Sequence, residues 1–524
     1  MRRSYALSVW SKNIEIFDQP SRRNRLGYRF SSKDHLRLIN NLYKVVSTAR
    51  TKDGTKGYGT KADEVKDHIN QIVCDLYAAW IADPNLVVGY SRKAAAFKSD
   101  GMYYGNLKQG VFLFIIDTLA AYGFIKNYIQ NSGYKATSSR MRCTQQLVDL
   151  IEGERLSWAS IIKDPAADTI ILKSKKDSKG IRKTLPFNDT DDPRIPEIRQ
   201  NLEEINSKLS RTLLNLFVSD DDQAEINKRL KKDTDTLALD FTQRHLYRVF
   251  NNDSWDEGGR FYGGWWQSVP SEYRKYIQIE GKQTVEWDYS SIHPTILYAK
   301  AGETIPNDAY DIPDWDRKYR DLIKKAFNQL INSDPKTKPK SKWRTLAPDI
   351  KPDPLPDNWT ELRKHQKLKP CREAFKNLTG RDYDELLSDI IKHHSPIADV
   401  FFSQTWGKMQ RLDSDIAEGV MMALYAKDIV VLPIHDSFIV RRGFEGYLKT
   451  TMNRVFQEHI AAIPGLKSDK QNISEGDWLL ENENDCILSG SDMIKIGMDG
   501  IDKYKMYGTR QSQWRQHWGL EGWD

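Results

Sequence analysis

The sequence predicts a mixed α+β protein of several domains, with a largely helical amino-terminal half and short strands around two aspartates in the carboxyl-terminal half. The chain has 524 residues, enough for about three or four domains at a typical size of about 150 residues. Apolar residues recur at helical spacing over much of residues 30–231. By contrast, residues 284–287 and 429–440 contain short β-like apolar runs, next to Asp288 and around Asp436.

In the amino-terminal region, residues 30–46 and 62–82 are predicted to be helices. Residues 105–153 are typical of a helix, an extended hairpin with a glycine turn, and a second helix. That order is similar to a winged helix, in which Arg140 and Arg142 would face the phosphate backbone of a duplex. A helical packing domain with a surface hairpin fits the pattern equally well.

The middle of the chain predicts a hairpin and then a helical lobe. Residues 165–190 are predicted to form a β-hairpin that turns at KKDSKG, and amphipathic helices follow in residues 196–217 and 222–231. The aromatic and glycine-rich stretch FNNDSWDEGGRFYGGWWQ follows, and the part of the chain predicted to contain the catalytic residues begins there. Residues 333–356 contain many prolines and lysines and are predicted to be an exposed inserted loop.

Composition excludes several classes of protein. The hydrophobic fraction is 39%, with no apolar run of the ~20 residues that a bilayer requires, so we expect a soluble protein with no membrane partner. The amino terminus lacks the apolar segment of a secretory signal, so we expect a cytoplasmic location. The four cysteines are too widely spaced for a metal-binding pair. Because the net charge is only +7, affinity for nucleic acid would come from local basic patches.

Two aspartates occupy strand-end or turn positions in segments far apart in the sequence. In TVEWDYSSIHPTILYA, Asp288 follows the predicted strand Thr284–Trp287 and precedes a helix that begins near Pro294. In DIVVLPIHDSFIV, Asp436 lies at the turn between two apolar runs. Either aspartate alone also fits a turn or cap acid. If the two lie together, they would repel by roughly 1–4 kcal/mol, and a shared cation would remove that conflict.

Magnesium fits this requirement, because Mg²⁺ binds a few carboxylate oxygens together with waters and substrate phosphates. Two such ions about 3.5–4 Å apart can stabilise the attacking and leaving oxygens of phosphoryl transfer. We therefore expect Asp288 and Asp436 to be the catalytic and metal-binding residues, with two Mg²⁺ ions as the cofactor and Mn²⁺ as a substitute.

The residues around both aspartates resemble the palm motifs of family A DNA polymerases, which are related to the single-subunit RNA polymerases. The resemblance lies in D-Y-S-x-I, followed later by H-D-[ES] between apolar strands. It implies that Asp288 and Asp436 bind the two metal ions. It also implies that Tyr289 and His293 lie at the incoming nucleotide and that His435 lies at the nucleic acid.

Between the two acids, DRKYRDLIKKAFNQLIN predicts a helix with Arg320, Lys324 and Asn328 on one face. This helix resembles the family's R-x-x-x-K fingers helix, in which the arginine and lysine bind the triphosphate. A solvated basic face is the alternative interpretation. The aromatic residues that usually follow the lysine are replaced here by Asn328 and Asn332.

A second predicted helix, GKMQRLDSDIAEGVMMALYA, precedes Asp436. Its opening, MQRLDSDI, resembles the family's M-Q-G-T-A-A-D-I, which implies that Gln410 approaches the minor groove of the primer and template. A surface glutamine at a helix start is the alternative. We interpret Asp415 as a structural acid of this helix.

Ahead of Asp288, GGRFYGGWWQSVP resembles the family's T-G-R…N-L-Q-x-I-P segment. The resemblance makes Arg260 and Gln267 candidates for contacts with the template or primer. Trp265 and Trp266 are predicted either to stack on bases or to pack in the core.

The resemblance covers roughly residues 255–445 and implies a right-hand polymerase fold, with an antiparallel β palm and helical fingers and thumb. The predicted domains are an amino-terminal helical, winged-helix-like region (1–160), a helical thumb-like lobe (161–250), the first part of the palm (251–302), fingers with a Lys/Pro-rich insertion (303–400), and the second part of the palm with the carboxy-terminal region (401–524). No D-x-E pattern in the amino-terminal half supports a proofreading exonuclease, so we expect none.

The resemblance implies a template-directed nucleotidyltransferase, and our first hypothesis is a DNA-directed DNA polymerase that extends a primer. Its partners would be primer–template DNA, nucleoside triphosphates and replication accessory proteins. Family A DNA polymerases usually carry glutamate at the position of His293, where it blocks a ribose 2′-hydroxyl; imidazole could fill that space or bind the hydroxyl. Because Ser437 resembles the RNA polymerases and Tyr289 the DNA polymerases, a DNA-directed RNA polymerase or primase is the second hypothesis. The third is a DNA-binding replication protein with a degenerate catalytic lobe.

Overall fold

A computed structural model describes most of the chain. The described residues are 16, 21–23, 27–31, 35–52, 61–97, 107–130, 138–165, 167–178, 180–233, 236–333, 346–350, 368–468 and 502–520. Most of the predicted inserted loop, residues 333–356, lies outside the described residues.

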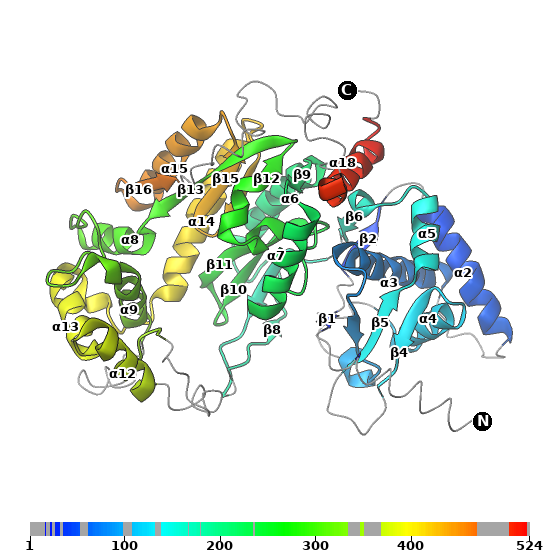
Figure 1. Ribbon diagram of the computed structural model, residues 1–524, viewed down its shortest axis with the longest axis horizontal. Helices are drawn as coiled ribbons and strands as arrows, with labels where there is room; N and C mark the ends of the chain where they lie inside the picture. The colour runs from blue at the N-terminus through cyan, green and yellow to red at the C-terminus, as the bar shows by residue number, and fades with distance from the viewer. Residues whose placement is uncertain are drawn as a thin grey trace.

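The fold is mixed α+β and consists of two lobes, each with its own cluster of buried apolar residues (Figure 1). We call the elements from β1 to β6 the amino-terminal lobe and those from β7 to β16 the carboxyl-terminal lobe. Helix α18, near the carboxyl end of the chain, lies beside the junction of the lobes. There Trp514 of α18 stacks on Trp158, with 5.6 Å between the ring centroids.

In the amino-terminal lobe, one sheet has the strand order β1-β3-β5-β4, and β2 pairs separately with β6. The antiparallel strands β4 and β5 follow helix α4 and precede helix α5, so the predicted order of helix, hairpin and helix is present. The elements of this lobe are β1 (Arg22–Arg23), β2 (Tyr28–Phe30), α2 (His35–Lys52), α3 (Ala62–Ala82), β3 (Val88–Tyr90), η1 (Ala94–Phe97), α4 (Gln109–Ala121), β4 (Ile125–Tyr128), β5 (Ser139–Cys143), α5 (Gln145–Gly153), η2 (Trp158–Ser160) and β6 (Ile161–Lys163).

The predicted contact of Arg140 with a duplex is wrong for its side chain. Arg140 lies in β5, which is flanked on both edges by β3 and β4, and only 5% of it is exposed. Arg142, two residues along the same strand, is half-buried.

The carboxyl-terminal lobe has a six-stranded antiparallel sheet that carries both aspartates. Its order is β14-β15-β13-β12-β9, and β16 pairs with the far end of β13. The turn Glu280–Gly281 joins β12 to β13 with φ angles of 54° and 72°, the conformation of a tight hairpin turn that matches strand twist. The strands are β9 (Leu214–Leu216), β12 (Ile277–Ile279), β13 (Lys282–Ser290), β14 (Val431–Ile434), β15 (Ser437–Arg441) and β16 (Gly465–Ser468).

A second sheet of this lobe has the order β11-β10-β7-β8, in which β10 and β11 form a long antiparallel hairpin. This hairpin packs against helix α14. The strands of the sheet are β7 (Ile170–Lys173), β8 (Thr184–Leu185), β10 (Arg244–Asn251) and β11 (Ser254–Gly264).

Helices surround the two sheets, and α9, α12 and α13 form a helical projection at the left of Figure 1. The helices are α6 (Ile195–Arg211), α7 (Asp220–Asp233), α8 (Ile292–Ala301), α9 (Arg320–Asn332), α12 (Leu368–Thr379), α13 (Tyr383–His393), α14 (Trp406–Tyr425), α15 (Glu445–Ile460) and α18 (Lys505–His517). Short 3-10 segments are η3 (Trp265–Ser268), η4 (Ser271–Tyr276), η5 (Arg317–Tyr319), η7 (Ser395–Val400) and η9 (Asp502–Tyr504). In the described part of the chain, no helix is both long and apolar enough to span a bilayer.

Residues 161–250, predicted to form a hairpin and then a helical lobe, also contain two strands that were not predicted, β9 and β10. Helix α6 ends at Arg211, because Leu214 and Leu216 alternate with Asn215 and pair with β12 as strand β9. Strand β10 of this region joins the second sheet, beside the antiparallel pair β7 and β8 that forms the predicted hairpin. Strand alternation over three residues is too short to be separated from helical periodicity in the sequence.

Candidate active site

The structure brings together Asp288, on strand β13, and Asp436, in the β14–β15 turn beside it. The register of β13 and β15 places Asp288 opposite Ser437, the residue that follows Asp436. The amide of Tyr289 donates a hydrogen bond to the main-chain oxygen of Asp436, with an N···O distance of 3.3 Å. Burial and then the charge of Asp436 raise the pKa of Asp288 to about 6. The two carboxylates therefore interact directly through their charges.

Strand alternation sorts the side chains of β13 between a polar face and a buried face. Because residues two apart share a face, Glu286 and Asp288 lie on the same side of the sheet. Ser437 donates a hydrogen bond to Glu286 from the neighbouring strand, and the guanidinium of Arg274 lies 3.2 Å from the same carboxylate. We call this side the polar face of β13.

The expectation that the side chain of Tyr289 contacts a nucleotide is wrong. Tyr289 points to the opposite side of the sheet and is 2% exposed. Its ring packs against those of Phe438 and Phe456, and its hydroxyl donates to the main-chain oxygen of Met452 at 2.8 Å. The two-residue period of a strand explains this placement, because Asp288 and its neighbour cannot face the same side.

Lys324 of helix α9 brings a positive charge near Asp288. Lys324 is exposed and forms no ion pair within the described residues, and its charge lowers the pKa of Asp288 against the larger effects of burial and Asp436. Arg320 is on the same face but is paired with Asp308, through Nε at 2.6 Å and Nη2 at 3.1 Å. The predicted cationic face therefore exists, although Arg320 already has a protein partner.

Tyr310 is a residue of the site that the sequence reasoning missed. Its ring lies under the guanidinium of Arg320, 5.1 Å from the ring centroid, and 6.0 Å from the ammonium of Lys324. It is buried beside Phe327, whose ring centroid is 5.9 Å away. Tyr310 precedes α9 and carries no motif, so no signal in the sequence pointed to it. Asn328 is half-buried on α9.

Arg260 and His293 meet at a shared carboxylate, Asp413, which the sequence reasoning also missed. Arg260 donates through Nε to Asp413 at 3.2 Å and pairs with it through Nη2, and His293 Nε2 lies 2.9 Å from Asp413. Burial alone would raise the pKa of Asp413, which is 1% exposed in its side chain, but these two partners outweigh burial and lower it. The nearby Asp436 also favours the charge of Arg260.

The expectation that Gln267 contacts nucleic acid is not supported by its hydrogen bonds. Its amide nitrogen donates to the main-chain oxygens of Phe261 at 3.0 Å and Pro433 at 3.2 Å, and its oxygen accepts from Gly264. The side chain instead ties β11 to β14. Trp265 and Trp266 are 2% and 0% exposed, so they pack in the core and do not stack on bases.

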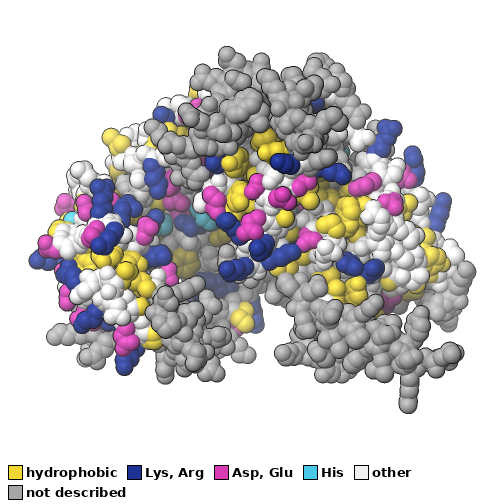
Figure 2. Space-filling model, viewed as in Figure 1, with side chains coloured by type: hydrophobic (Ala, Val, Ile, Leu, Met, Phe, Trp, Pro, Cys, Tyr) yellow, Lys and Arg dark blue, Asp and Glu magenta, His cyan; other side chains and the backbone are white. Residues whose placement is uncertain are grey.

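Gln410 and His435 stay on accessible surfaces near the site. Gln410 lies half-buried in the first half of α14, and its side chain makes no hydrogen bond within the described residues. His435 is exposed at the β14–β15 turn with φ of 57°, and its ring lies 6.0 Å from that of Tyr262. Figure 2 shows the surface hollowed between the helical projection and the central sheets, with Lys and Arg side chains along the hollow.

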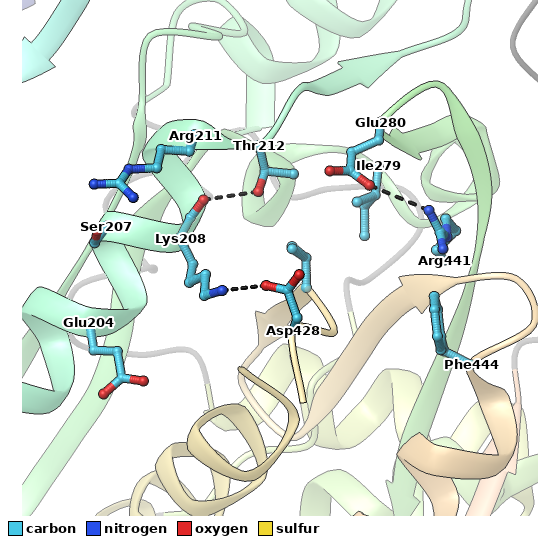
Figure 3. Close-up of a pocket in the computed structure, with 11 residues that line it drawn as sticks. Glu204, Ser207, Lys208, Arg211, Thr212, Ile279, Glu280, Asp428, Arg441 and Phe444 are labelled. Carbon is cyan, nitrogen blue, oxygen red and sulfur yellow. Dashed lines mark hydrogen bonds and ion pairs between the residues drawn. The ribbon is translucent and has the colours of Figure 1, made fainter. Parts of the chain in front are cut away.

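A pocket of about 550 Å³ lies at the other end of β13, away from Asp288 (Figure 3). Two ion pairs cross it, between Lys208 and Asp428 and between Arg441 and Glu280. Glu204 and Arg211 also line the pocket and belong to neither pair, and none of the predicted site residues lines it.

Comparisons with known proteins do not define a family for this chain. No protein-family model and no curated protein matches the sequence. A solved structure, the POL domain of Pol1 from M. smegmatis in complex with DNA primer-template and dNTP, aligns with 84% of this chain at 11% identity and a TM-score of 0.24. The aligned part spans 66% of that chain, slightly under two thirds of its length. Because both identity and TM-score are low, we base the proposal below on the residues of the site.

Proposed function

We propose that this chain is a template-directed nucleotidyltransferase, a DNA polymerase that extends a primer by attack of its 3′-hydroxyl on the α-phosphate of a nucleotide. The observation that carries the proposal is that Asp288 on β13 and Asp436 in the β14–β15 turn lie side by side, with the charge of Lys324 acting on Asp288 from α9. In a right-hand arrangement, the six-stranded sheet is the palm and the helical projection is the fingers.

The carboxylate pair fits magnesium by its donor chemistry. The described residues contain no group of three or more His, Cys, Asp or Glu side chains that could enclose a metal ion. Mg²⁺ commonly takes only one or two carboxylates from a protein and completes its shell with waters and substrate phosphates. When bound, two such ions would neutralise phosphate charge and lower the barrier to attack by the hydroxyl.

The remaining residues bind and orient the substrate. Lys324 and, once released from Asp308, Arg320 would bind the triphosphate and stabilise the charge of the leaving pyrophosphate. Gln410 and His435 lie on accessible surfaces near the carboxylates and would face the primer end and its template. The hollow between the projection and the sheets offers a path for the duplex.

A second candidate, synthesis of RNA on the same site, is favoured by the position of His293. Its imidazole is held by Asp413, at 2.9 Å, on helix α14. A ring held in this way would leave room for a ribose hydroxyl or donate a hydrogen bond to it.

The test is gel-resolved extension of a labelled primer, with the template present or omitted, and with deoxynucleotides or ribonucleotides supplied separately. We expect template-dependent extension with deoxynucleotides that requires Mg²⁺ or Mn²⁺ and stops in EDTA. Extension with ribonucleotides alone would select the second candidate. Absence of synthesis with either set, together with retained DNA binding, would contradict both and favour a binding protein.

A further inference from the structure

Asp288 has a cationic partner that no sequence motif marks. Strand β16 pairs antiparallel with the end of β13, and its register places Lys467 directly opposite Asp288. Directly opposed side chains lie on the same face of a sheet, so Lys467 belongs to the polar face of β13. Its ammonium nitrogen is 3.0 Å from a carboxylate oxygen of Asp288.

Strand pairing places Lys467 beside Asp288, and the two side chains remain accessible to solvent. Four consecutive residue pairs hold β16 against β13, from Trp287 with Ser468 to Ser290 with Gly465. The Lys467 side chain is 58% exposed and that of Asp288 is 28% exposed. Because the four-carbon stem of lysine rotates freely, the ammonium can leave the carboxylate without any movement of the strand.

The neighbouring negative charge explains why a cation is needed beside Asp288. Asp288 lies beside Asp436, and two carboxylates so placed repel each other unless positive charge lies near them. Lys324 acts from α9 only through its longer-range charge, whereas Lys467 makes direct contact. The Lys467 ammonium therefore provides the positive charge that a divalent cation bound to Asp288 would otherwise provide.

This inference rests on the proposed function. We propose that Lys467 is a positioning residue, which supplies a positive charge to Asp288 before a divalent cation binds. Lys467 then competes with that cation for the Asp288 carboxylate. When the cation binds, the ammonium is released into the solvent-exposed edge of the site. There it can pair with a phosphate of the nucleotide or primer, so that metal binding and substrate binding become linked.

The test measures Mn²⁺ binding to the full chain without nucleotide, by the loss of free-ion signal in electron paramagnetic resonance. We expect Lys467→Gln to bind Mn²⁺ about three- to tenfold more tightly than the wild type, because one competing charge has been removed. Lys467→Arg keeps the charge and is expected to bind Mn²⁺ like the wild type. Lys449→Gln is the matched control, because Lys449 lies over the ring of Trp287 at 4.6 Å on the buried side of the same strand.

The outcomes separate this inference from the proposed function. Asp288→Asn is included as the variant that removes the carboxylate itself, and it should weaken Mn²⁺ binding. If it does so while Lys467→Gln binds Mn²⁺ like the wild type, the role of Lys467 is overturned and the metal site stands. If Asp288→Asn binds Mn²⁺ as well as the wild type, both are overturned. Equal tightening in Lys467→Gln and Lys449→Gln would also overturn it, because the effect would then be one of net charge alone.

Discussion

Two buried ionic clusters join the β10–β11 hairpin to α14, yet only one of them faces the aspartates. In the first, Arg248 of β10 contacts Asp415 at 2.9 Å and Glu418 at 2.8 Å. In the second, Arg260 of β11 contacts Asp413, which also binds His293. Both have the same chemistry and connect the same two elements.

The clusters differ in how completely they are closed. Arg248 is 0% exposed, and its third nitrogen donates to the main-chain oxygen of Gly259 at 2.7 Å, so all three guanidinium nitrogens have partners. Arg260 is 18% exposed and also interacts with the charge of Asp436. A closed cluster stabilises the fold, whereas one that is open toward the reacting groups can also orient substrate. The two clusters contain the same types of residue. What separates the stabilising role from the substrate-orienting role is where each cluster lies relative to the polar face of β13.

The largest effect is expected at the aspartates themselves. Asp436→Asn should reduce primer extension by at least roughly 10²–10³-fold, because the site loses charge that holds the cations. The matched control is Asp428→Asn, which changes an exposed aspartate at the far end of the same hairpin. Extension rates under saturating Mg²⁺ give the comparison, and near-wild-type extension by Asp436→Asn would refute the assignment.

Breaking the closed cluster should affect stability rather than chemistry. Arg248→Met removes the buried ion-pair partner of Glu418 and leaves Asp415 paired only with Arg411, at 3.1 Å, which should cost about 3–5 kcal/mol in free energy of unfolding. Urea unfolding measures the loss, and the protein that remains folded should extend primers at close to the wild-type rate. A stable but inactive variant would show that this cluster also serves the site.

Breaking the cluster of Arg260, Asp413 and His293 should instead slow primer extension. Asp413→Asn removes the charge that holds Arg260 and His293, and we expect primer extension to fall about tenfold or more, from the loss of charged hydrogen bonds of about 1.5–3 kcal/mol. Asp415→Asn is the same substitution two residues away and should slow extension far less. If the two variants lose primer extension equally, the claim that only the second cluster serves the active site is wrong.

The smallest effect is a difference in pH dependence. Burial raises the pKa of Glu418 despite Arg248, so its folded form takes up a proton at higher pH than its unfolded form, and the wild type should gain stability relative to Glu418→Gln as pH falls toward about 4.3. The pKa of Asp413 is lowered, so its contribution stays fully present until pH falls below about 3.9. As pH is lowered from 7.5 to 4.5, the urea midpoint of the wild type minus that of Glu418→Gln should therefore rise, whereas the same difference for Asp413→Asn should stay constant. The same trend in both variants would contradict the sign of one of these shifts.

Local sequence patterns were sufficient to predict the elements around the site. Helical periodicity predicted α3, α9 and α14 to within a few residues, and the two apolar runs around Asp436 predicted the β14–β15 hairpin. These patterns are reliable because each depends on residues within one turn or one strand. The same period of two would have shown that Tyr289 faces away from Asp288, had it been applied to that neighbour.

Which polar side chains share the site depends on how distant segments pack together. Tyr310, Asp413 and Lys467 come from three separate segments, and none of the three matches a residue of the family's motifs. Strand register and helix packing bring them to Arg320, Arg260 and Asp288. Register also placed Gln267 and Arg140 within the protein rather than on a nucleic-acid surface. A contact between distant segments depends on how whole elements pair, and a single sequence carries no local signal for that pairing.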